Sequence, residues 1–192
     1  MTDAPGAGAV PPAILLARHG ETDDNLPPRR FQGFIDTPLN DTGRRQAAAL
    51  AERVASRRIA SLWCSDLCRA RETAEAVGRR LRLTPRPDPR LREGYRGRWE
   101  GRLFVDVADH EPARYAAWLR AGEGFRFPGG ESLREHADRV AAAVDEIRRC
   151  GELPALIVCH GGSIRVMLSL RDPRGLDAFH HFNVPNVEVV AL

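Results

Sequence analysis

Two histidine-centred segments carry the residues that could do chemistry. The first, L-L-A-R-H-G-E-T-D-D-N, runs from Leu15 to Asn25 and sets Arg18 beside His19 and Gly20. Arginine can bind two phosphate oxygens through its planar fork, and glycine lets the backbone approach a ligand closely. A neutral imidazole beside that fork can attack phosphorus. A lone histidine is more often a surface residue, so the prediction of a nucleophile depends on what surrounds it.

The second segment is His160-Gly161-Gly162. It follows the apolar run A-L-I-V-C at 155–159, just as the first follows A-I-L-L-A at 13–17. Short continuous apolar runs are typical of strands buried on both faces, and ligands of parallel sheets bind beyond the carboxyl ends of the strands. If these two strands are neighbours, His19 and His160 meet in one crevice.

The remaining elements must hold these strands in place. A capping box at Ser132 and Glu135 begins one helix, and Asp41 or Thr42 is available to cap another. Apolar spacing predicts helices over 47–54, 70–78 (with Gly78 near the end) and 133–147, and strands at 61–64 and 187–192. Strands that alternate with helices indicate an α/β fold, a three-layer sandwich with a mostly parallel central sheet and helices on both faces.

Two stretches depart from this pattern. Residues 84–130 contain Pro85, Pro87 and Pro89 and an isolated helical stretch at 112–119, which predicts a small inserted lobe. Residues 1–12 consist mainly of Ala, Gly and Pro, and we expect a disordered tail there. Residues 13–192 then form one domain.

Further motifs accompany the two histidine segments. In chain order they are R-H-G-E-T-D-D-N at 18–25, F-Q-G-F-I-D-T-P-L-N at 31–40, S-D-L-C-R-A-R-E-T-A at 65–74, L-R-E at 91–93, G-R-W-E-G at 97–101, F-P-G-G-E-S at 127–132 and V-C-H-G-G-S-I-R at 158–165. R-H-G alone would be a weak signal, but the ordered set is specific. From about Ile14 to Leu192, the chain resembles the histidine phosphatase superfamily in its phosphoglycerate mutase-like branch.

The resemblance implies a role for each matched residue. His19 would be the nucleophile, with its other ring nitrogen held by a backbone carbonyl so that the attacking nitrogen keeps its lone pair. The donors around the phosphoryl oxygens would be Arg18, Arg69 and His160. Asn25 and the Gly161 amide would complete the pocket. Arg71 is a rival to Arg69, but the L-x-R-A context matches Arg69.

The resemblance also implies that Glu93 gives a proton to the leaving oxygen and later activates water. Burial would favour its protonated form, and nearby arginines would oppose it. Glu100 is the alternative, although in the family's pattern it occupies a structural turn. Arg96 and Arg98 depart from the pattern, because many relatives carry small or acidic residues there.

Other matched positions concern the mouth of the site. Gln32 and Gly33 match a substrate-side loop, and Glu21 and Thr22 are expected to line the same mouth, with ordinary loop residues as the alternative for all four. Four further histidines match no catalytic position, and we assign them to the surface or to interdomain contacts: His110, His136, His180 and His181.

Composition limits the class of protein. The 192 residues carry a net charge of +3, and all 29 basic residues are arginine. Residues 79–102 hold nine arginines, which favours a solvated face or a rim for anionic substrates. No nucleic-acid motif, apolar membrane span or signal peptide is present, so we expect a cytoplasmic protein. The four cysteines are expected to be buried free thiols, and we expect no cofactor and no metal, because Cys159 beside His160 has no second ligand pair.

Three functions fit this sequence. The first is a metal-independent phosphatase whose partner is a small phosphorylated metabolite. The second is a phosphoglycerate mutase, although mutases of this branch have a longer segment between the donor Glu and the second His. The third is a non-catalytic binding domain, which is disfavoured because every catalytic position is retained. The sequence favours hydrolysis through a phosphohistidine and leaves a homodimer open.

Overall fold

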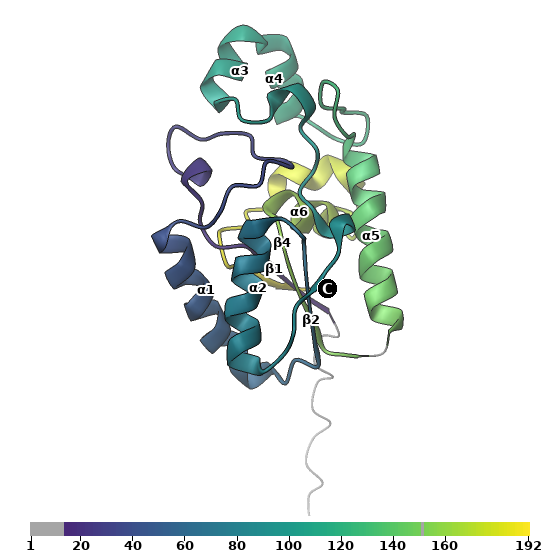
Figure 1. Cartoon of the computed structure of the whole chain (residues 1–192). Coiled ribbons are helices and arrows are strands. Elements are labelled where there is room, and N and C mark those ends of the chain that lie inside the picture. Colours follow the sequence, from purple (N-terminus) through teal and green to yellow (C-terminus); the bar gives the residue numbers. More distant parts are fainter. Residues whose placement is uncertain (1–13, 151) are drawn as a thin grey trace, which may run out of the picture.

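The computed structural model describes residues 14–150 and 152–192 (Figure 1), and the tail expected at 1–12 lies outside the described residues. Within these residues, five strands form one sheet in the order β3-β2-β4-β1-β5. The strands are β1 (Ile14–Arg18), β2 (Ser61–Cys64), β3 (Arg86–Pro87), β4 (Ala155–Cys159) and β5 (Val189–Ala191). All neighbours are parallel except β5, which is antiparallel to β1. The mostly parallel sheet is confirmed.

β1 and β4 are adjacent, which is the condition under which the two histidines were expected to meet. Their register pairs Ile14 with Ala155 and Arg18 with Cys159, so both strands end at the same level. Because His19 and His160 follow directly, the two histidines leave the sheet side by side.

Alternate side chains of these strands enter two separate cores, which explains their continuous apolar sequence. Leu16 and Ile157 face one core, and Leu15 and Val158 face the other. Two pairs of helices cover the faces (Figure 1): α1 (Asp41–Val54) and α2 (Cys68–Leu81) on one side, α5 (Leu133–Arg149) and α6 (Gly161–Ser169) on the other. This is the predicted three-layer sandwich.

The helix ends correct two details of the prediction. Asn40, rather than Asp41 or Thr42, caps α1: its backbone is extended, and its side-chain oxygen accepts a hydrogen bond from the Gly43 amide at 2.8 Å. α2 continues through Gly78 and ends where Arg82 adopts a left-handed conformation. The capping box of Ser132 and Glu135 at the start of α5 is present as predicted.

The inserted region is smaller than the predicted range of 84–130. Its first residues belong to the sheet, because Arg86 and Pro87 form β3 beside β2. The helices α3 (Phe104–His110) and α4 (Pro112–Leu119) lie at the end of the molecule opposite the start of β1 (Figure 1). An aromatic cluster around the buried Trp99 gives this part a core of its own.

Two further expectations concern cysteines and membranes. All four cysteines are free, with Cys64 and Cys159 buried as expected, Cys68 partly buried and Cys150 exposed. Cys150 is exposed because it lies at the C-terminal end of α5, past the last buried turn. Among the described residues, no helix has the length and apolar character needed to cross a bilayer.

Candidate active site

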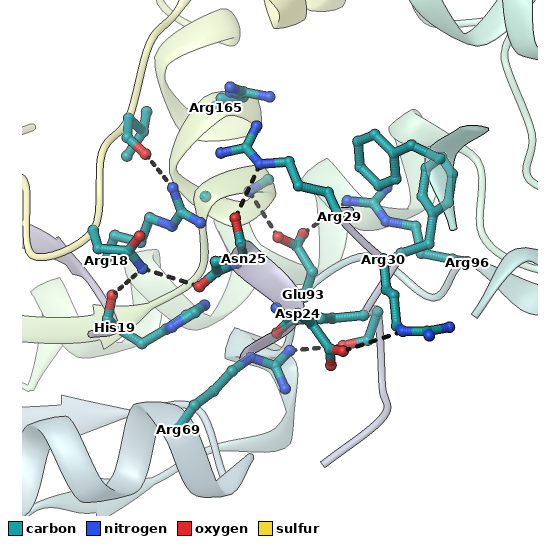
Figure 2. Close-up of a pocket in the computed structure, with 18 of the residues that line it drawn as sticks. Arg18, His19, Asp24, Asn25, Arg29, Arg30, Arg69, Glu93, Arg96 and Arg165 are labelled. Atoms are coloured by element: carbon teal, nitrogen blue, oxygen red, sulfur yellow. Dashed lines mark hydrogen bonds and ion pairs between the residues drawn. The ribbon is translucent and has the colours of Figure 1, made fainter. Parts of the chain in front are cut away.

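A cavity of about 450 Å³ opens beyond the carboxyl ends of β1 and β4. Its wall includes most of the predicted site residues (Figure 2): Arg18, His19, Asn25, Gln32, Gly33, Arg69, Glu93 and Gly161. These residues come from five separate segments of the sequence. The fold therefore brings them together at the edge of the sheet where ligands of parallel α/β proteins bind.

His19 is held in one orientation at the floor of this cavity. Its Nδ1 lies 2.6 Å from the carbonyl oxygen of Gly20. A carbonyl can only accept, so Nδ1 carries the proton and Nε2 keeps a lone pair. Burial, followed by the charges of Arg69 and Arg18, places the pKa of His19 well below its ordinary value. The imidazole is therefore neutral and able to act as a nucleophile.

Close backbone contact fixes the segment around His19. A Cβ on Gly20 would lie 2.4 Å from the carbonyl oxygen of Gly43 in α1, so any larger residue would push the two apart. The Gly20 amide also donates to Thr73 Oγ1 of α2 at 3.0 Å, and Asn186 donates to the His19 carbonyl at 3.0 Å. Two helices and the segment that contains Asn186 thus hold His19 in place.

Two arginines flank the imidazole, Arg18 partly buried and Arg69 fully buried. Arg18 Nη1 donates to the Val184 carbonyl at 2.7 Å, which leaves the rest of its fork facing the cavity. Arg69 is fully buried and donates to the carbonyls of Ile35 and Gly33 at 2.7 and 2.8 Å. Arg71, its rival in the sequence, is exposed on α2. The L-x-R-A context had selected the arginine that reaches the cavity.

His160 lies beneath the cavity rather than in its wall. It is fully buried, and its ring centroid is 5.1 Å from that of His19, so the predicted meeting of the two histidines is confirmed. Neither of its ring nitrogens has a hydrogen-bond partner among the described residues. Gly161 is the first residue of α6, where backbone amides have no intrahelical acceptor and attract anions.

Glu93 faces His19 across the cavity (Figure 2), with a side chain only 14% exposed. Its Oε2 accepts a hydrogen bond from the Gly162 amide at 2.9 Å, and Oε1 accepts from Gly94 and Arg96 at 2.8 and 3.1 Å. Burial alone would raise the pKa of Glu93. Arg96, His136 and the two backbone amides outweigh burial and lower it to about 2. With no substrate bound, Glu93 is therefore a carboxylate.

Arg96, Arg98 and Glu100 have separate places around Glu93. Arg96 pairs with Glu93 and lies over the ring of Phe127, whereas Arg98 is exposed. Glu100 accepts from the amides of Phe34 and Arg96 at 2.6 and 3.2 Å, and it is not part of the cavity wall. Its contacts are those of a structural turn.

His136 corrects an expectation from the sequence, because it is neither a surface nor an interdomain residue. It is 1% exposed, and its Nε2 lies 3.1 Å from Ser163 Oγ, which in turn donates to the Arg92 carbonyl at 2.9 Å. Its Nδ1 faces Gly94. His136 therefore supports the backbone on which Glu93 stands. Its position on the buried face of α5 was a signal in the sequence for burial.

The other histidines agree with their assignments. His180 is partly buried and bonds to the Trp118 carbonyl at 2.8 Å, which joins the inserted region to the main fold. His110 and His181 are exposed.

Two residues predicted at the mouth lie behind it. Glu21 accepts a hydrogen bond from Asn40, the cap of α1, at 3.0 Å. Thr22 is fully buried and accepts from Gln32 at 2.7 Å. Neither belongs to the cavity wall, because the loop after Gly20 turns its side chains toward α1 and its own interior. Thr22 instead positions Gln32, which does line the cavity.

Several residues of the cavity wall are ones whose role the sequence motifs did not predict. They include Arg29, Arg165, Trp118 and Asn186. Arg165 stood in the V-C-H-G-G-S-I-R motif, four residues after Gly161 and hence on the same face of α6. The others come from loops or from the inserted helices, and only the tertiary structure places them here. Within the described part of the chain, no group of three or more His, Cys, Asp or Glu side chains is arranged to hold a metal ion.

Comparison with known proteins identifies the family. Residues 14–192 match the sequence model of the histidine phosphatase superfamily (branch 1). The chain belongs to this superfamily. The match covers every strand and helix of the described fold, including both histidines that meet in the cavity.

Relatives within the superfamily carry different activities in their names. GpmB of Yersinia pestis (strain Pestoides F), named a probable phosphoglycerate mutase, is 39% identical over 160 residues, 81% of this chain and 73% of that protein. A mycobacterial glucosyl-3-phosphoglycerate phosphatase in complex with VO3 has a TM-score of 0.83 at 31% identity, over 93% of this chain and 89% of that chain. The alpha-ribazole phosphatase of Shigella flexneri has a TM-score of 0.79 at 27% identity, over 90% and 86%.

The buried histidines of this histidine phosphatase superfamily member make its stability depend on pH. The pKa values of His19 and His160 lie well below 6.5, and that of His136 is lowered to about 4, in each case mainly by burial. The unfolded chain therefore binds these protons first as pH falls. We expect full stability above pH 6.5 and a loss of up to about 4 kcal/mol per pH unit as the pH falls from 6.5 toward 4.

Urea unfolding in phosphate-free buffer at pH 7.5, 6.0 and 5.0 measures this loss. His136→Leu removes one titrating group and should reduce the slope by about a third, whereas the exposed His181 gives a matched control, His181→Leu, that keeps the full slope. Equal stability at pH 7.5 and 5.0 would contradict the prediction.

Proposed function

We propose that this protein is a phosphatase that hydrolyses phosphomonoesters of small metabolites through a phosphohistidine on His19. The arrangement of His19 carries the proposal: a neutral imidazole with Nε2 available, flanked by Arg18 and Arg69 and facing Glu93 across one cavity. A nucleophile, phosphate-binding donors and a proton carrier are the parts that such a reaction needs.

In the first step, the lone pair of His19 Nε2 attacks phosphorus. The N–P bond forms while the bond from phosphorus to the ester oxygen breaks, and the leaving oxygen takes a proton from the Glu93 carboxyl. Arg18 and Arg69 bind the phosphoryl oxygens, where negative charge spreads in the transition state. The N–H of the buried, neutral His160 ring and the first amide of α6 supply further hydrogen bonds.

In the second step, water attacks the phosphohistidine. The Glu93 carboxylate takes a proton from this water, the N–P bond breaks with its electron pair returning to Nε2, and phosphate leaves. Glu93 then holds this proton, which departs with the phosphate, so that the carboxylate is restored before the next substrate binds. The same donors serve both displacements, so one site lowers both barriers.

The low pKa of Glu93 in the protein without substrate has to be raised before Glu93 can act as an acid. A bound phosphoryl group supplies negative charge that offsets the field of Arg18, Arg69 and Arg96. A phosphate monoester has a second pKa of about 6, so its monoanion also brings a proton that the carboxylate can accept. We infer that Glu93 gains its proton together with the substrate.

A mutase is the second candidate, and the name of the Yersinia relative favours it. Phosphoryl transfer back to the substrate requires that the phosphohistidine be shielded from water. In this protein, the insertion between Glu93 and the start of α5 contains only two short α-helices, α3 and α4, among the described residues, and so offers little chain to cover the site. The phosphatase names of the structural relatives and this short insertion support hydrolysis.

Phosphate release separates the two candidates. We expect purified protein to release free phosphate in step with substrate loss across a panel of phosphorylated metabolites, with EDTA present and with inhibition by vanadate. It should not interconvert 2- and 3-phosphoglycerate, with or without a bisphosphoglycerate primer. Rapid primed isomerisation with little phosphate release would establish the mutase, and loss of turnover in EDTA that a divalent ion restores would reject the metal-independent scheme.

The cytoplasmic location predicted from the sequence is part of this proposal. The four free thiols support it, because a reducing compartment keeps cysteines in that state.

A further inference from the structure

The cavity wall carries more positive charge than the phosphoryl group needs. It contains six arginines and two carboxylates: Arg18, Arg29, Arg30, Arg69, Arg96 and Arg165, with Asp24 and Glu93. Arg96 pairs with Glu93 at 3.1 Å, and Arg30 lies 3.9 Å from Asp24. Within residues 14–150 and 152–192, the other four arginines have no carboxylate within ion-pair distance. Two of these, Arg18 and Arg69, serve the reacting phosphoryl group.

Arg29 and Arg165 are the two that remain. Arg165 is partly buried on α6, and its Nε is fully buried with no hydrogen-bond partner among the described residues. Arg29 donates through Nε to the Asn25 carbonyl at 3.1 Å, which leaves both terminal nitrogens available. Figure 2 draws the two guanidinium groups together, on the side of the cavity away from Arg69.

These two charges are close enough to repel each other. Arg29 acts to lower the pKa of Arg165, which is lowered mainly by burial, and both arginines act to lower the pKa of Arg18. Like charges gathered in a partly buried cavity attract anions strongly, because water screens them poorly there. Their position matters too: Arg165 is one helical turn beyond Gly161, or about 6 Å along α6. An anion bound by Arg165 is therefore a different group from the phosphoryl group that reacts next to Gly161.

We propose that Arg29 and Arg165 bind a second anionic group of the substrate, a carboxylate or a second phosphate on the part that leaves with the ester oxygen. This inference rests on the proposed phosphatase activity and narrows its substrate class to phosphomonoesters with two anionic ends. Planar guanidinium groups suit both anions, because a carboxylate and a phosphate can each accept two parallel hydrogen bonds from one guanidinium group.

Matched substrates test the subsite. One pair is 3-phosphoglycerate and glycerol 1-phosphate, in which a carboxylate replaces a hydroxymethyl group. The other is fructose 1,6-bisphosphate and fructose 1-phosphate, which differ by the second phosphate. In one of the two pairs, we expect kcat/KM to be higher, by a factor on the order of 10 or more, for the substrate that carries the second anionic group. The pair in which this preference occurs tells whether the subsite binds a carboxylate or a phosphate.

Arg29→Gln and Arg165→Gln should each reduce this preference by about 10-fold. Arg165→Lys keeps the charge and should retain more of it. Arg79→Gln is the matched control, because Arg79 is exposed at the far end of α2 and its replacement removes the same charge. The preference for the substrate with the second anionic group should persist in this variant. Because Arg29 is exposed on a loop, its variant tests the proposal even if Arg165→Gln fails to fold.

The outcomes separate this inference from the proposed function. Equal kcat/KM within both pairs, or variants that lower both members of a pair equally, would overturn the second-anion subsite while leaving a phosphatase. If neither these esters nor p-nitrophenyl phosphate is hydrolysed, the phosphatase fails. Calorimetry of His19→Ala then tests the subsite independently: tighter binding of 3-phosphoglycerate than of glycerol 1-phosphate, lost in a second Arg29→Gln change, supports it, and equal binding rejects it.

Discussion

Replacing His19 with alanine should abolish turnover and trapped phosphate together. With wild-type protein and labelled substrate, rapid alkaline quenching should leave label on the chain, and acid should remove it, because a phosphoryl group on an imidazole nitrogen is stable to base and labile to acid. His19→Ala removes the only atom proposed to form the N–P bond. We expect the rate to fall by a factor on the order of 10⁵ or more, with no label retained.

His160→Ala should behave differently. It removes a buried donor next to the phosphoryl group and leaves the nucleophile in place, 5.1 Å away between ring centroids. We expect a fall on the order of 10² to 10³ in rate, with some label still formed. The comparison distinguishes a residue that forms the intermediate from one that stabilises the charge around it.

His181→Ala serves as the matched control, because His181 is exposed and outside the cavity wall. Its rate and its label should equal those of the wild type. Label that persists in His19→Ala, or that peptide mapping assigns to Ser163 or to a cysteine, would refute the phosphohistidine mechanism.

The second large effect concerns Glu93. Glu93→Gln keeps a similar shape and an oxygen that can accept from the Gly162 amide, but it can no longer give or take a proton. Hydrolysis of alkyl phosphates, whose leaving oxygen needs a proton, should slow by a factor on the order of 10² to 10⁴. Formation of the phosphohistidine from p-nitrophenyl phosphate should slow far less, because nitrophenolate leaves without one.

The comparison of the two substrates provides the test. Burst kinetics isolate the first step, in which the leaving group matters, from the attack of water. Glu100→Gln is the control, since Glu100 binds the Phe34 amide and was the alternative proton donor in the sequence. It should change both substrates by the same factor. If Glu93→Gln also slows both first steps equally, Glu93 has a structural role.

The sequence by itself determined the two strands that directly precede His19 and His160, and the helices that flank them. The runs at 155–159 and 61–64 became β4 and β2 with unchanged bounds, because buried parallel strands require uninterrupted apolar residues. The ordered motifs placed His19, Arg69 and Glu93, which the fold brings into one cavity. Strands, helices and ordered motifs of this kind can be predicted from the sequence, because they depend on residues that are close together along the chain.

Only the tertiary structure decided how the charges around this site are balanced. Glu93 is ionised without substrate because Arg96, His136 and two amides, from separate segments, together outweigh its burial. The tertiary structure also decided the burial of His136 against Gly94 and Ser163. It likewise turned Glu21 toward the cap of α1 and Thr22 toward Gln32. Arg29 and Arg165 lie on the same side of the cavity although they are 136 positions apart in the sequence. Electrostatic interactions act through space, so groups far apart along the chain set a pKa or a binding site that no local pattern contains.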